Sequence, residues 1–320
     1  MNLRTAVRLT RPFTLVPPLL GILSGAVCAF GSAHNPDPAH RLTPALLAAG
    51  LLVSLAAALL NGANNTLNQL TDLEVDRINK PERPLVTGEA RAQEAWTLTW
   101  VVYALALLPT WWIEVPGDSL LARHQCFWLF LAGFLFTLVY SLPAFGRTKA
   151  RGLLANLTIA IPRGCLLKVA GWTVVASAGS WEPWVIGLLF GLFIFGAAST
   201  KDFSDVEGDR AGGCQTLPVK YGNRTAVKII SPFFVLPWLA LPILAWVPDP
   251  AEPARRLLTG NPLLLSALGV LLALWGGYTV WLLARNPDEL STTENHPSWT
   301  HMYLMMMAAQ IGFALAYVGR

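Results

Sequence analysis

Three oxygen-bearing side chains follow one another at helical spacing near the end of an apolar stretch. Asn68, Asp72 and Asp76 are each four residues apart, so in a continuous helix they would share one face. Like charges at this spacing repel one another, and a row of such groups is costly unless a cation satisfies it. Mg²⁺ prefers a few carboxylates together with water and phosphate oxygens. The spacing therefore predicts a Mg²⁺ site on one face of a helix.

A second acidic segment has a similar pattern. Asp202, Asp205 and Asp209 stand at positions i, i+3 and i+7, which again is one stripe of a helix. Glu74 and Glu207 fall off the two stripes and are weaker candidates. Either segment alone could be a solvated acidic helix end. Two matched segments are more specific, and together they indicate one shared site.

Basic residues surround both acidic segments. Arg77, Lys80 and Arg83 follow the first segment, while Lys201 and Arg210 flank the second. A diphosphate bridged by Mg²⁺ would satisfy both charges, because the carboxylates would hold the metal while Arg and Lys bind the free oxygens. The alternative is that these basic residues form local salt bridges or only set membrane topology.

The rest of the chain has the composition of a membrane protein. Of its 320 residues, 54% are hydrophobic and 13% are charged, whereas charged residues make up about a quarter of an ordinary soluble domain. Apolar stretches of about twenty residues, the length that crosses a bilayer, recur along one helical domain, 1–320. We expect nine spans, at 13–33, 43–62, 94–114, 125–142, 153–176, 182–200, 229–247, 262–284 and 299–318. The first is expected to remain as a helix rather than to be a cleaved signal.

The distribution of Lys and Arg predicts the orientation, because loops rich in these residues stay in the cytoplasm. With the N-terminus inside, the inner set is Arg4, Arg8, Arg11, Arg77, Lys80, Arg83, Arg91, Arg147, Lys149, Arg151, Lys201, Arg210, Lys220, Arg224, Lys228 and Arg285. The outer set is Arg41, Arg123, Arg255, Arg256 and Arg320. Both acidic segments are then expected on the cytoplasmic side, and the C-terminus outside.

Several other classes of function receive no support. The net charge of +4 is explained by this asymmetry, so it gives no reason to expect a nucleic acid, and no protein partner is implied. The four cysteines form no CxxC pair, which argues against a zinc site or a disulfide framework. The five histidines form no cluster and receive no role.

Taken together, these segments resemble the two signatures of the UbiA superfamily of intramembrane prenyltransferases. A third stretch, from Tyr140-Ser-Leu-Pro to Arg147 and Lys149, is similar to a basic loop of that family, and Arg11-Pro12 resembles its opening. The resemblance implies an all-α bundle around a central cavity with a cytoplasmic cap. An isoprenyl diphosphate would bind there through Mg²⁺, with its tail running into the membrane.

The resemblance also implies roles for individual residues. The expected metal ligands or their close supports are Asn68, Asp72, Asp76, Asp202, Asp205 and Asp209. Among these, catalysis is expected to depend most on Asp72, Asp76, Asp202 and Asp209. The expected substrate contacts are Asn68, Arg11, Arg83, Tyr140, Arg147, Lys149, Arg163 and Lys201.

The acceptor is less clearly indicated. Residues 68–81, Arg163-Gly-Cys-Leu-Leu and residues 201–209 resemble enzymes that prenylate homogentisate in tocopherol and plastoquinone synthesis. Arg83-Pro84-Leu and Thr216-Leu-Pro218 look equally like chlorophyll synthases and geranylgeranylglyceryl phosphate transferases. A membrane terpene cyclase of the same superfamily would need no acceptor. A CDP-alcohol phosphotransferase is disfavoured because its Asp-Gly-x-x-Ala-Arg core is absent, and a transporter would not explain two matched stripes.

Two ionisable residues fall within the fifth expected span. Such residues usually face a cavity or a partner. Arg163 lies seven residues beyond Asn156 on one stripe and could meet an acceptor's carboxylate or the diphosphate. Lys168, five residues later, is on a different face, and we expect it to be structural.

Overall fold

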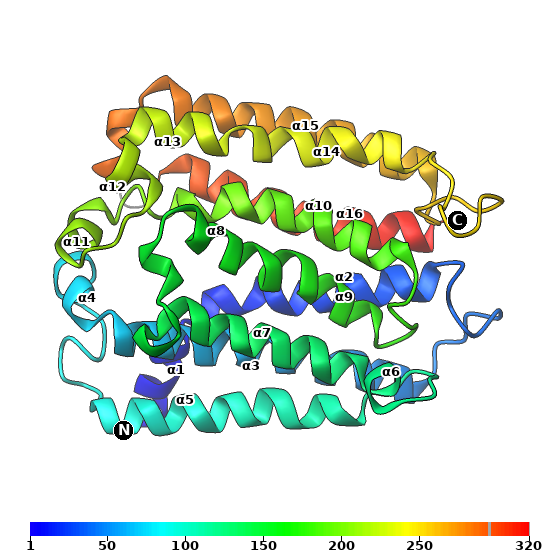
Figure 1. Ribbon diagram of the computed structural model, residues 1–320, viewed down its shortest axis with the longest axis horizontal. Helices are drawn as coiled ribbons and strands as arrows, with labels where there is room; N and C mark the ends of the chain where they lie inside the picture. Colours follow the sequence, from blue (N-terminus) through cyan, green and yellow to red (C-terminus); the bar gives the residue numbers. More distant parts are fainter. Residues whose placement is uncertain (294–295, 320) are drawn as a thin grey trace.

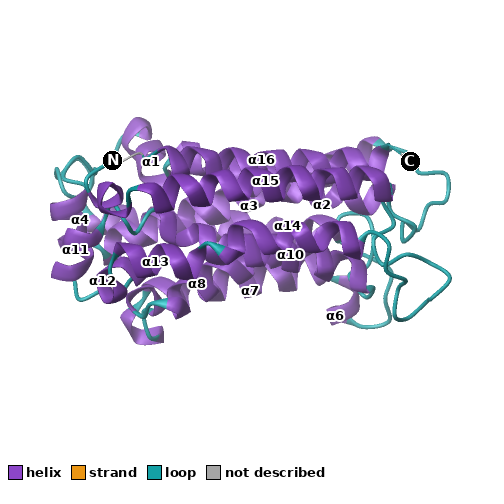
Figure 2. Ribbon diagram, turned by 90° about the horizontal axis from the view of Figure 1, so that it is seen from above, coloured by secondary structure: helices purple, strands orange, loops and turns teal. Residues whose placement is uncertain are grey.

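A computed structural model describes residues 1–293 and 296–319, so Arg320, counted above on the outer side, lies outside the described residues. Helices dominate, and they run side by side in an elongated bundle. The labelled N- and C-termini lie at opposite ends of this bundle (Figures 1 and 2). The all-α class predicted from the sequence is confirmed for the described residues.

Seven helices in the described part of the chain are long and apolar enough to cross a membrane. They are Pro12–Gly31, Pro44–Thr71, Leu153–Trp172, Trp181–Thr200, Asn223–Leu244, Pro262–Arg285 and Pro297–Val318. In the labels of Figure 1 the longest of them include α3 (Pro44–Thr71), α15 (Pro262–Arg285) and α16 (Pro297–Val318). Each of the seven corresponds to one of the expected spans.

The other two expected spans, 94–114 and 125–142, are helices that do not reach this standard. The first is α5 (Ala92–Leu107), which tightens into the 3₁₀ helix η2 (Leu108–Trp112). The second is α7 (Gln125–Ser141), a shorter apolar helix. Nine membrane spans are therefore supported in seven cases and stay a prediction in these two.

The other α-helices either form parts of the spans given above or connect them. They are α1 (Leu3–Thr10), α2 (Val16–Gly31), α4 (Leu73–Asn79), α6 (Leu120–Arg123), α8 (Leu153–Ala160), α9 (Leu167–Trp172), α10 (Trp181–Ala197), α11 (Val206–Ala211), α12 (Leu217–Tyr221), α13 (Asn223–Ile230) and α14 (Pro232–Leu244). Figure 1 shows α1, α4, α11 and α12 at one end of the bundle, which we call the α4 end.

Packing divides the apolar interior into separate clusters. The largest joins α10 with α14, α15 and α16, and its buried rings include Phe193, Trp238 and Phe313. A second cluster lies between α2, α3, α7 and α9 and contains Val53 and Phe130. Residues from both clusters line a common cavity, so the centre of the bundle is not filled by one continuous core.

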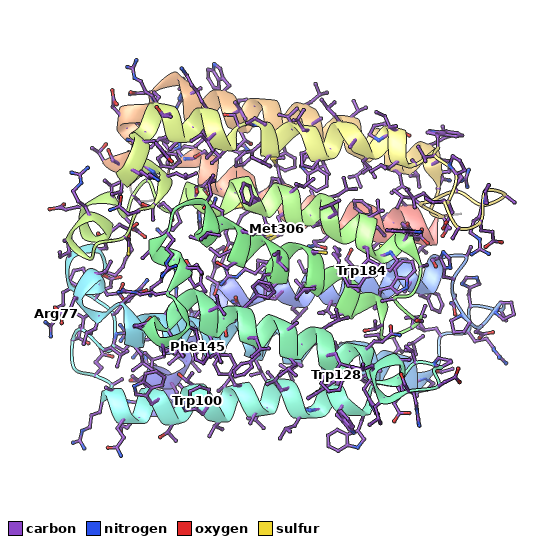
Figure 3. The ribbon with its side chains drawn as sticks, viewed as in Figure 1. Arg77, Trp100, Trp128, Phe145, Trp184 and Met306 are labelled. Carbon is purple, nitrogen blue, oxygen red and sulfur yellow. The ribbon has the colours of Figure 1, made fainter. Side chains whose placement is uncertain are left out.

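Side chains show the same division between interior and ends. Met306 lies inside the bundle, whereas Arg77 projects outward at the α4 end (Figure 3). Arg77 is exposed and pairs with Glu74 three residues before it. This favours the local salt-bridge interpretation for Arg77, and the off-stripe Glu74 points away from the cavity lining.

Candidate active site

A cavity of about 740 Å³ begins at the α4 end and continues among the helices. Of the residues predicted from the sequence, it is lined by Arg11, Asn68, Asp72, Asp76, Arg83, Tyr140, Lys149, Arg163, Lys201, Asp202, Asp205 and Asp209. Arg147 is not on the lining, but its guanidinium donates a hydrogen bond of 3.2 Å to Asp72. The two acidic segments thus lie on one cavity. They are in direct contact, because Asn79 donates a hydrogen bond to the carbonyl of Asp205, 126 residues further along the chain.

The first acidic segment is not one continuous helix, so that part of the prediction is wrong. Helix α3 ends at Thr71, and Asp72 caps it with φ −111° and ψ 15° before α4 begins at Leu73. The side chain of Asp72 is held from outside the helix by Lys149 and Arg147, which favours the break. Asn68 remains in α3, where its amide oxygen accepts a hydrogen bond of 2.5 Å from Ser141.

The second segment is also broken, which corrects the expectation of a single helical stripe. The helix of the sixth span ends at Thr200, turns follow through Asp205, and α11 begins at Val206. The backbone N–H of Asp205 donates to the carbonyl of Asp202, which is the i→i−3 pattern of a turn rather than of an α-helix. The carboxylates of Asp202, Asp205 and Asp209 still line the cavity.

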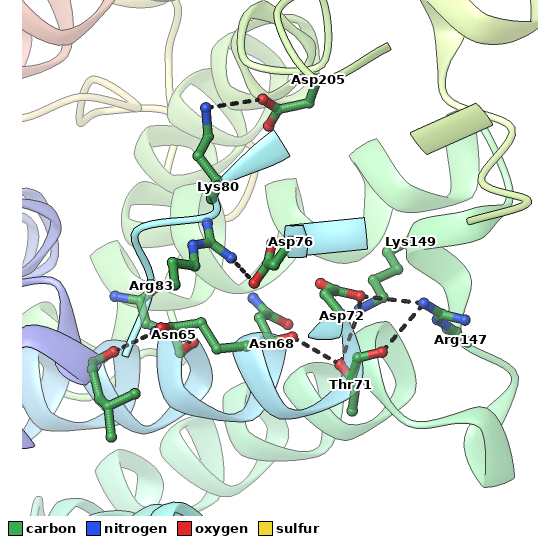
Figure 4. A network of polar contacts seen from close by, with 12 residues as sticks. Asn65, Asn68, Thr71, Asp72, Asp76, Lys80, Arg83, Arg147, Lys149 and Asp205 are labelled. Atoms are coloured by element: carbon green, nitrogen blue, oxygen red, sulfur yellow. Dashed lines mark hydrogen bonds and ion pairs between the residues drawn. The ribbon is translucent and has the colours of Figure 1, made fainter. Parts of the chain in front are cut away.

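Basic side chains hold the carboxylates of the site (Figure 4). Arg83 pairs with Asp76, and Lys149 pairs with Asp72. Across the two segments, the Lys80 ammonium lies 3.4 Å from the carboxylate of Asp205. The acidic and basic side chains therefore neutralise each other. Each ion pair could also separate, so that its cation binds a negatively charged group and its carboxylate binds a metal ion.

Burial raises the carboxyl pKa values of Asp202 and Asp209 in the second segment further than that of Asp76 in the first. Burial, with the charges of Asp209 and Asp205, raises the pKa of Asp202 to about 8. Burial and Asp205 raise the pKa of Asp209 to about 7. Burial also raises the pKa of Asp76 against the opposing effect of Arg83. Gathering carboxylates in this way is unfavourable without a cation, so the site has the electrostatics of a cation site.

The donor set fits Mg²⁺ when a phosphate group completes it. Within the described residues, no three His, Cys, Asp or Glu side chains are close enough to hold a metal ion by themselves. Mg²⁺ characteristically uses one or two carboxylates, several waters and substrate phosphate oxygens rather than an all-protein cage. Carboxylates on both sides of one cavity, surrounded by Arg and Lys, meet that requirement.

Asn79 ties the two acidic segments together, a role that the sequence analysis missed. Its amide group donates to the carbonyl of Asp205 at 3.0 Å and accepts from the N–H of Gly208 at 3.0 Å. Gly208 is needed there because a Cβ would come within 2.5 Å of the Asn79 amide. The signal was the run Asn79-Lys80-Pro81, which supported the resemblance without any role for Asn79.

A ladder of amides on α3 positions Arg11. Asn61, Asn65 and Gln69 are four residues apart, and their amide groups donate to the carbonyls of Thr14, Thr10 and Leu9 at 2.9, 2.8 and 2.7 Å. These bonds fix the chain where α1 ends and satisfy carbonyls that lack a helical partner. Arg11 itself adopts a left-handed backbone with φ 55°.

Arg163 lies in an irregular part of the fifth span, where residues Ile161–Leu166 form a π-helix between α8 and α9. Such segments occur often at functional sites. Gly164 lies so close to Gly191 of α10 that a Cβ would come within 2.4 Å of the Gly191 Cα. Lys168, by contrast, is 2% exposed, is absent from the cavity lining, and places its ammonium 4.3 Å from the ring centroid of Phe190.

Apolar helices and a mixed acidic and basic cavity together define a polytopic α-helical integral membrane protein with a site suited to a metal-bound diphosphate. Comparison with known proteins narrows this class. The chain belongs to the UbiA prenyltransferase family, whose family model matches residues 15–295.

Curated relatives and solved structures agree with this assignment. The chain is 31% identical to chlorophyll synthase of Arabidopsis thaliana over 223 residues, covering 69% of this chain and 54% of that protein. It is 26% identical to digeranylgeranylglyceryl phosphate synthase of Methanobrevibacter smithii over 266 residues, covering 83% and 86%. The structure of a UbiA homolog from Archaeoglobus fulgidus bound to GPP and Mg²⁺ superposes with a TM-score of 0.70 at 20% identity, covering 99% and 100%.

These matches confirm the family and an all-helical UbiA fold, while the nine spans and the cytoplasmic cap stay predictions. The chain spans between about half and two thirds of the length of the first curated relatives that it matches. The names of these two curated relatives do not mention homogentisate, so they do not support the expected homogentisate branch.

Proposed function

We propose that this protein is a Mg²⁺-dependent membrane prenyltransferase, which moves an isoprenyl group from an isoprenyl diphosphate to an acceptor and releases diphosphate. The observation that carries the proposal is the pairing of both acidic segments with basic side chains around one cavity. Family membership supports it. The solved relative with GPP and Mg²⁺ supports the substrate class and the metal.

The basic side chains would bind the diphosphate. Arg83, Arg147 and Lys149 now contact carboxylates, and a diphosphate could take over their hydrogen bonds because its oxygens accept in the same way. Lys201 and Tyr140 line the same cavity and would add contacts. The carboxylates released from these pairs would then be free to hold the metal.

Bond cleavage would follow from this arrangement. The allylic C–O bond breaks with its electron pair leaving on the diphosphate, and the acceptor's electron pair forms the new bond to the prenyl C1. When the nucleophile is a hydroxyl or an aromatic carbon, its proton passes to the released diphosphate or to water. Bound Mg²⁺ supplies Lewis-acid stabilisation of the departing diphosphate. Arg83 and Lys149 add positive charge at the same oxygens.

The deeper lining suits an isoprenyl tail. Leu60, Phe130, Phe136 and Leu167 line the cavity below the charged residues. Apolar walls exclude the water that would quench an allylic cation, and aromatic faces can stabilise its charge. The tail would then lie among the helices, in contact with apolar surface.

The acceptor is proposed within limits. A homogentisate-like aromatic acid is the first candidate from the motifs, and tocopherol or quinone biosynthesis would be its setting. The relatives support the alternatives more directly, namely a chlorophyllide or geranylgeranylglyceryl phosphate. A terpene cyclase of the same superfamily would form a cyclic hydrocarbon from the diphosphate with no acceptor.

We also propose that the α4 end faces the cytoplasm. The basic residues of the predicted inner side, among them Arg8, Arg77 and Lys220, belong to elements at that end, and loops rich in such residues stay inside. A cysteine placed at exposed Arg77 should then react with a membrane-impermeant reagent only after cells are opened. Labelling in intact cells would refute this orientation.

Reconstituted enzyme tests the main proposal. Purified protein would be incubated with Mg²⁺, geranylgeranyl or phytyl diphosphate, and homogentisate, 4-hydroxybenzoate, a chlorophyllide or geranylgeranylglyceryl phosphate. We expect one prenylated product, abolished by EDTA and nearly abolished by Asp72→Ala. Glu207→Ala is the matched control, because Glu207 is exposed and off the cavity lining. Full activity of folded Asp72→Ala protein would refute the metal assignment.

A further inference from the structure

Cations are shared unequally between the two acidic segments. In the first segment, three basic side chains hold two aspartates. The second segment supplies three carboxylates, yet among the described residues no Lys or Arg lies within ion-pair distance of Asp202 or Asp209. Asp205 is paired, but its partner Lys80 belongs to the first segment. Lys80 therefore brings positive charge to a segment that has an excess of carboxylates.

Lys80 lies inside the site rather than on its surface. It caps the end of α4, lines the cavity, and has only 11% of its side chain exposed. Burying an ammonium is costly unless an anion or water compensates it. The ammonium lies 3.4 Å from the carboxylate of Asp205, whose side chain is 22% exposed. Figure 4 shows these two side chains directed at each other from different segments.

Other contacts already join the two segments at this point. Asn79 binds the backbone of Asp205 and of Gly208, and a Cβ on Gly208 would come within 2.5 Å of the Asn79 amide. Four residues later, a Cβ on Gly212 would come within 2.3 Å of Val75 in α4. Helices α4 and α11 are thus closely packed, so the two segments do not depend on the ion pair to stay together.

The ion pair is one that a divalent cation can displace. A well-formed charged N–H···O bond is about 2.7–2.9 Å long, so the separation of 3.4 Å is a looser contact. Mg²⁺ carries twice the charge of an ammonium and binds carboxylate oxygens at about 2.0–2.1 Å. Coulomb attraction grows with charge and falls with distance, so the carboxylate attracts Mg²⁺ more strongly than it attracts Lys80. Two cations at one carboxylate also repel each other, so the metal excludes the ammonium.

We propose, resting on the function proposed above, that Lys80 is a positioning residue that substitutes for the metal: its ammonium neutralises Asp205 in the metal-free protein, and Mg²⁺ must displace it to use that carboxylate. Lys80 thereby sets the metal concentration at which the site fills. It also reduces the repulsion among the carboxylates of the second segment while no metal is bound. The displaced ammonium stays at the cavity, where an anion that arrives with the metal can bind it.

Metal binding without substrate tests this proposal. Purified protein would be titrated with Mn²⁺ in the absence of any diphosphate, and unbound Mn²⁺ would be measured by electron paramagnetic resonance. We expect Lys80→Met to bind Mn²⁺ about 3- to 30-fold more tightly than the wild type, because a charged contact no longer competes. Lys80→Arg, which keeps the charge, should stay within about threefold of the wild type. Lys80→Gln is titrated alongside, so that the test does not depend on the folding of the Met variant.

Arg77→Met is the matched control. It removes the same charge from the same helix, but Arg77 is exposed and pairs with Glu74, which is off the cavity lining. Solvent and salt screen an exposed charge, so its Mn²⁺ affinity should change by less than about twofold. In an Asp205→Asn background, Lys80→Met should bring no gain in affinity, because the carboxylate for which the two cations compete is gone.

Thermal unfolding separates this role from that of a simple tether. Without metal, Lys80→Met leaves Asp205 without its cation and should unfold at a lower temperature than the wild type. Saturating Mn²⁺ should restore most of that loss, because the metal then neutralises the carboxylate. A residue that only joined the two segments would leave the loss uncorrected by metal, and that result would refute the proposal.

The outcomes also separate this proposal from the proposed function. A Lys80→Met protein that binds Mn²⁺ no more tightly than the wild type would refute the role of Lys80, as would an equal gain in Arg77→Met. Absence of Mn²⁺ binding from the wild type and every variant, both alone and with inorganic diphosphate, would refute the metal-dependent function itself. Tighter binding by Lys80→Met together with no prenyl transfer by the wild type would refute the prenyltransferase function alone.

Discussion

Replacing Asn79 by alanine should weaken metal binding more than it weakens the fold. The amide of Asn79 makes two hydrogen bonds of 3.0 Å that join Asp205 and Gly208 to the first acidic segment. A hydrogen bond contributes about 1 kcal/mol net, so the loss is about 2 kcal/mol. If bound Mg²⁺ requires both segments in place, that energy appears in its affinity as a roughly 30-fold higher concentration for half-maximal activity.

The measurement is prenyl transfer as a function of Mg²⁺ concentration, with thermal unfolding of the same samples. Asn223→Ala is the matched control. Its amide also makes two hydrogen bonds, to the carbonyl of Pro287 at 2.9 Å and to Ser291 at 3.4 Å, but Asn223 is not on the cavity lining. The reasoning fails if both variants lose similar thermal stability and Asn79→Ala needs no more Mg²⁺ than the control.

Four further predictions follow from the cavity. Gly164→Ala should reduce prenyl transfer strongly, because the added Cβ would come within 2.4 Å of the Gly191 Cα. Gly191→Ala is the control and should stay active, because its added Cβ would lie 3.6 Å or more from its neighbours. Equal activity of the two variants would contradict the role of the π-helix. Because the pKa values of Asp202 and Asp209 are raised to about 8 and about 7, protons compete with the metal, so the Mg²⁺ concentration for half-maximal activity should fall as pH rises from 6 to 8.5. In the absence of metal, the carboxyls of Asp202 and Asp209 bind more protons in the native protein than in the unfolded chain, where an Asp pKa is about 3.9. The free energy of unfolding should therefore fall as pH rises from 4 to 8. A free energy of unfolding that increases over this range would contradict the raised pKa values. Ala57→Phe should favour geranyl over geranylgeranyl diphosphate, because Ala57 lines the cavity among apolar residues, and an unchanged ratio of kcat/KM values would place the tail elsewhere.

The gathering of the two acidic segments on one cavity could be predicted from the sequence, because it depends on residue types and on the ends of the helices that carry them. Asp72 and Asp202 both follow long apolar helices, and basic residues accompany each. Spacing predicted the local structure less well. An interval of four residues is compatible with one continuous helix and also with two helices that meet at Asp72. The side chain of Asp72 binds Lys149, which lies far away in the sequence. Contacts of that kind are set by tertiary structure, which spacing does not report.

Other features had no local signal. Nothing around Asn79 in the sequence indicates that its partner is Gly208, and a π-helix at Arg163 is not distinguished from an α-helix by apolar periodicity. The cavity-lining residues Trp299 and Tyr303 of α16 were also missed, because they look like ordinary apolar positions of a membrane helix. The seven clear spans followed from hydropathy, whereas α5 and α7 did not meet the same combined standard of length and hydropathy.

The division of the apolar interior into separate clusters links the enzyme's lifetime to its supply of substrate. On the proposed function, the prenyl tail fills the space between those clusters and makes contacts that the helices do not make with each other. A ligand that binds only the folded state stabilises it, and the stabilisation grows with the logarithm of the ligand concentration once that exceeds Kd. A cell short of isoprenyl diphosphate would therefore hold a looser protein, more open to membrane proteases, and would adjust the amount of enzyme to the flux of its substrate.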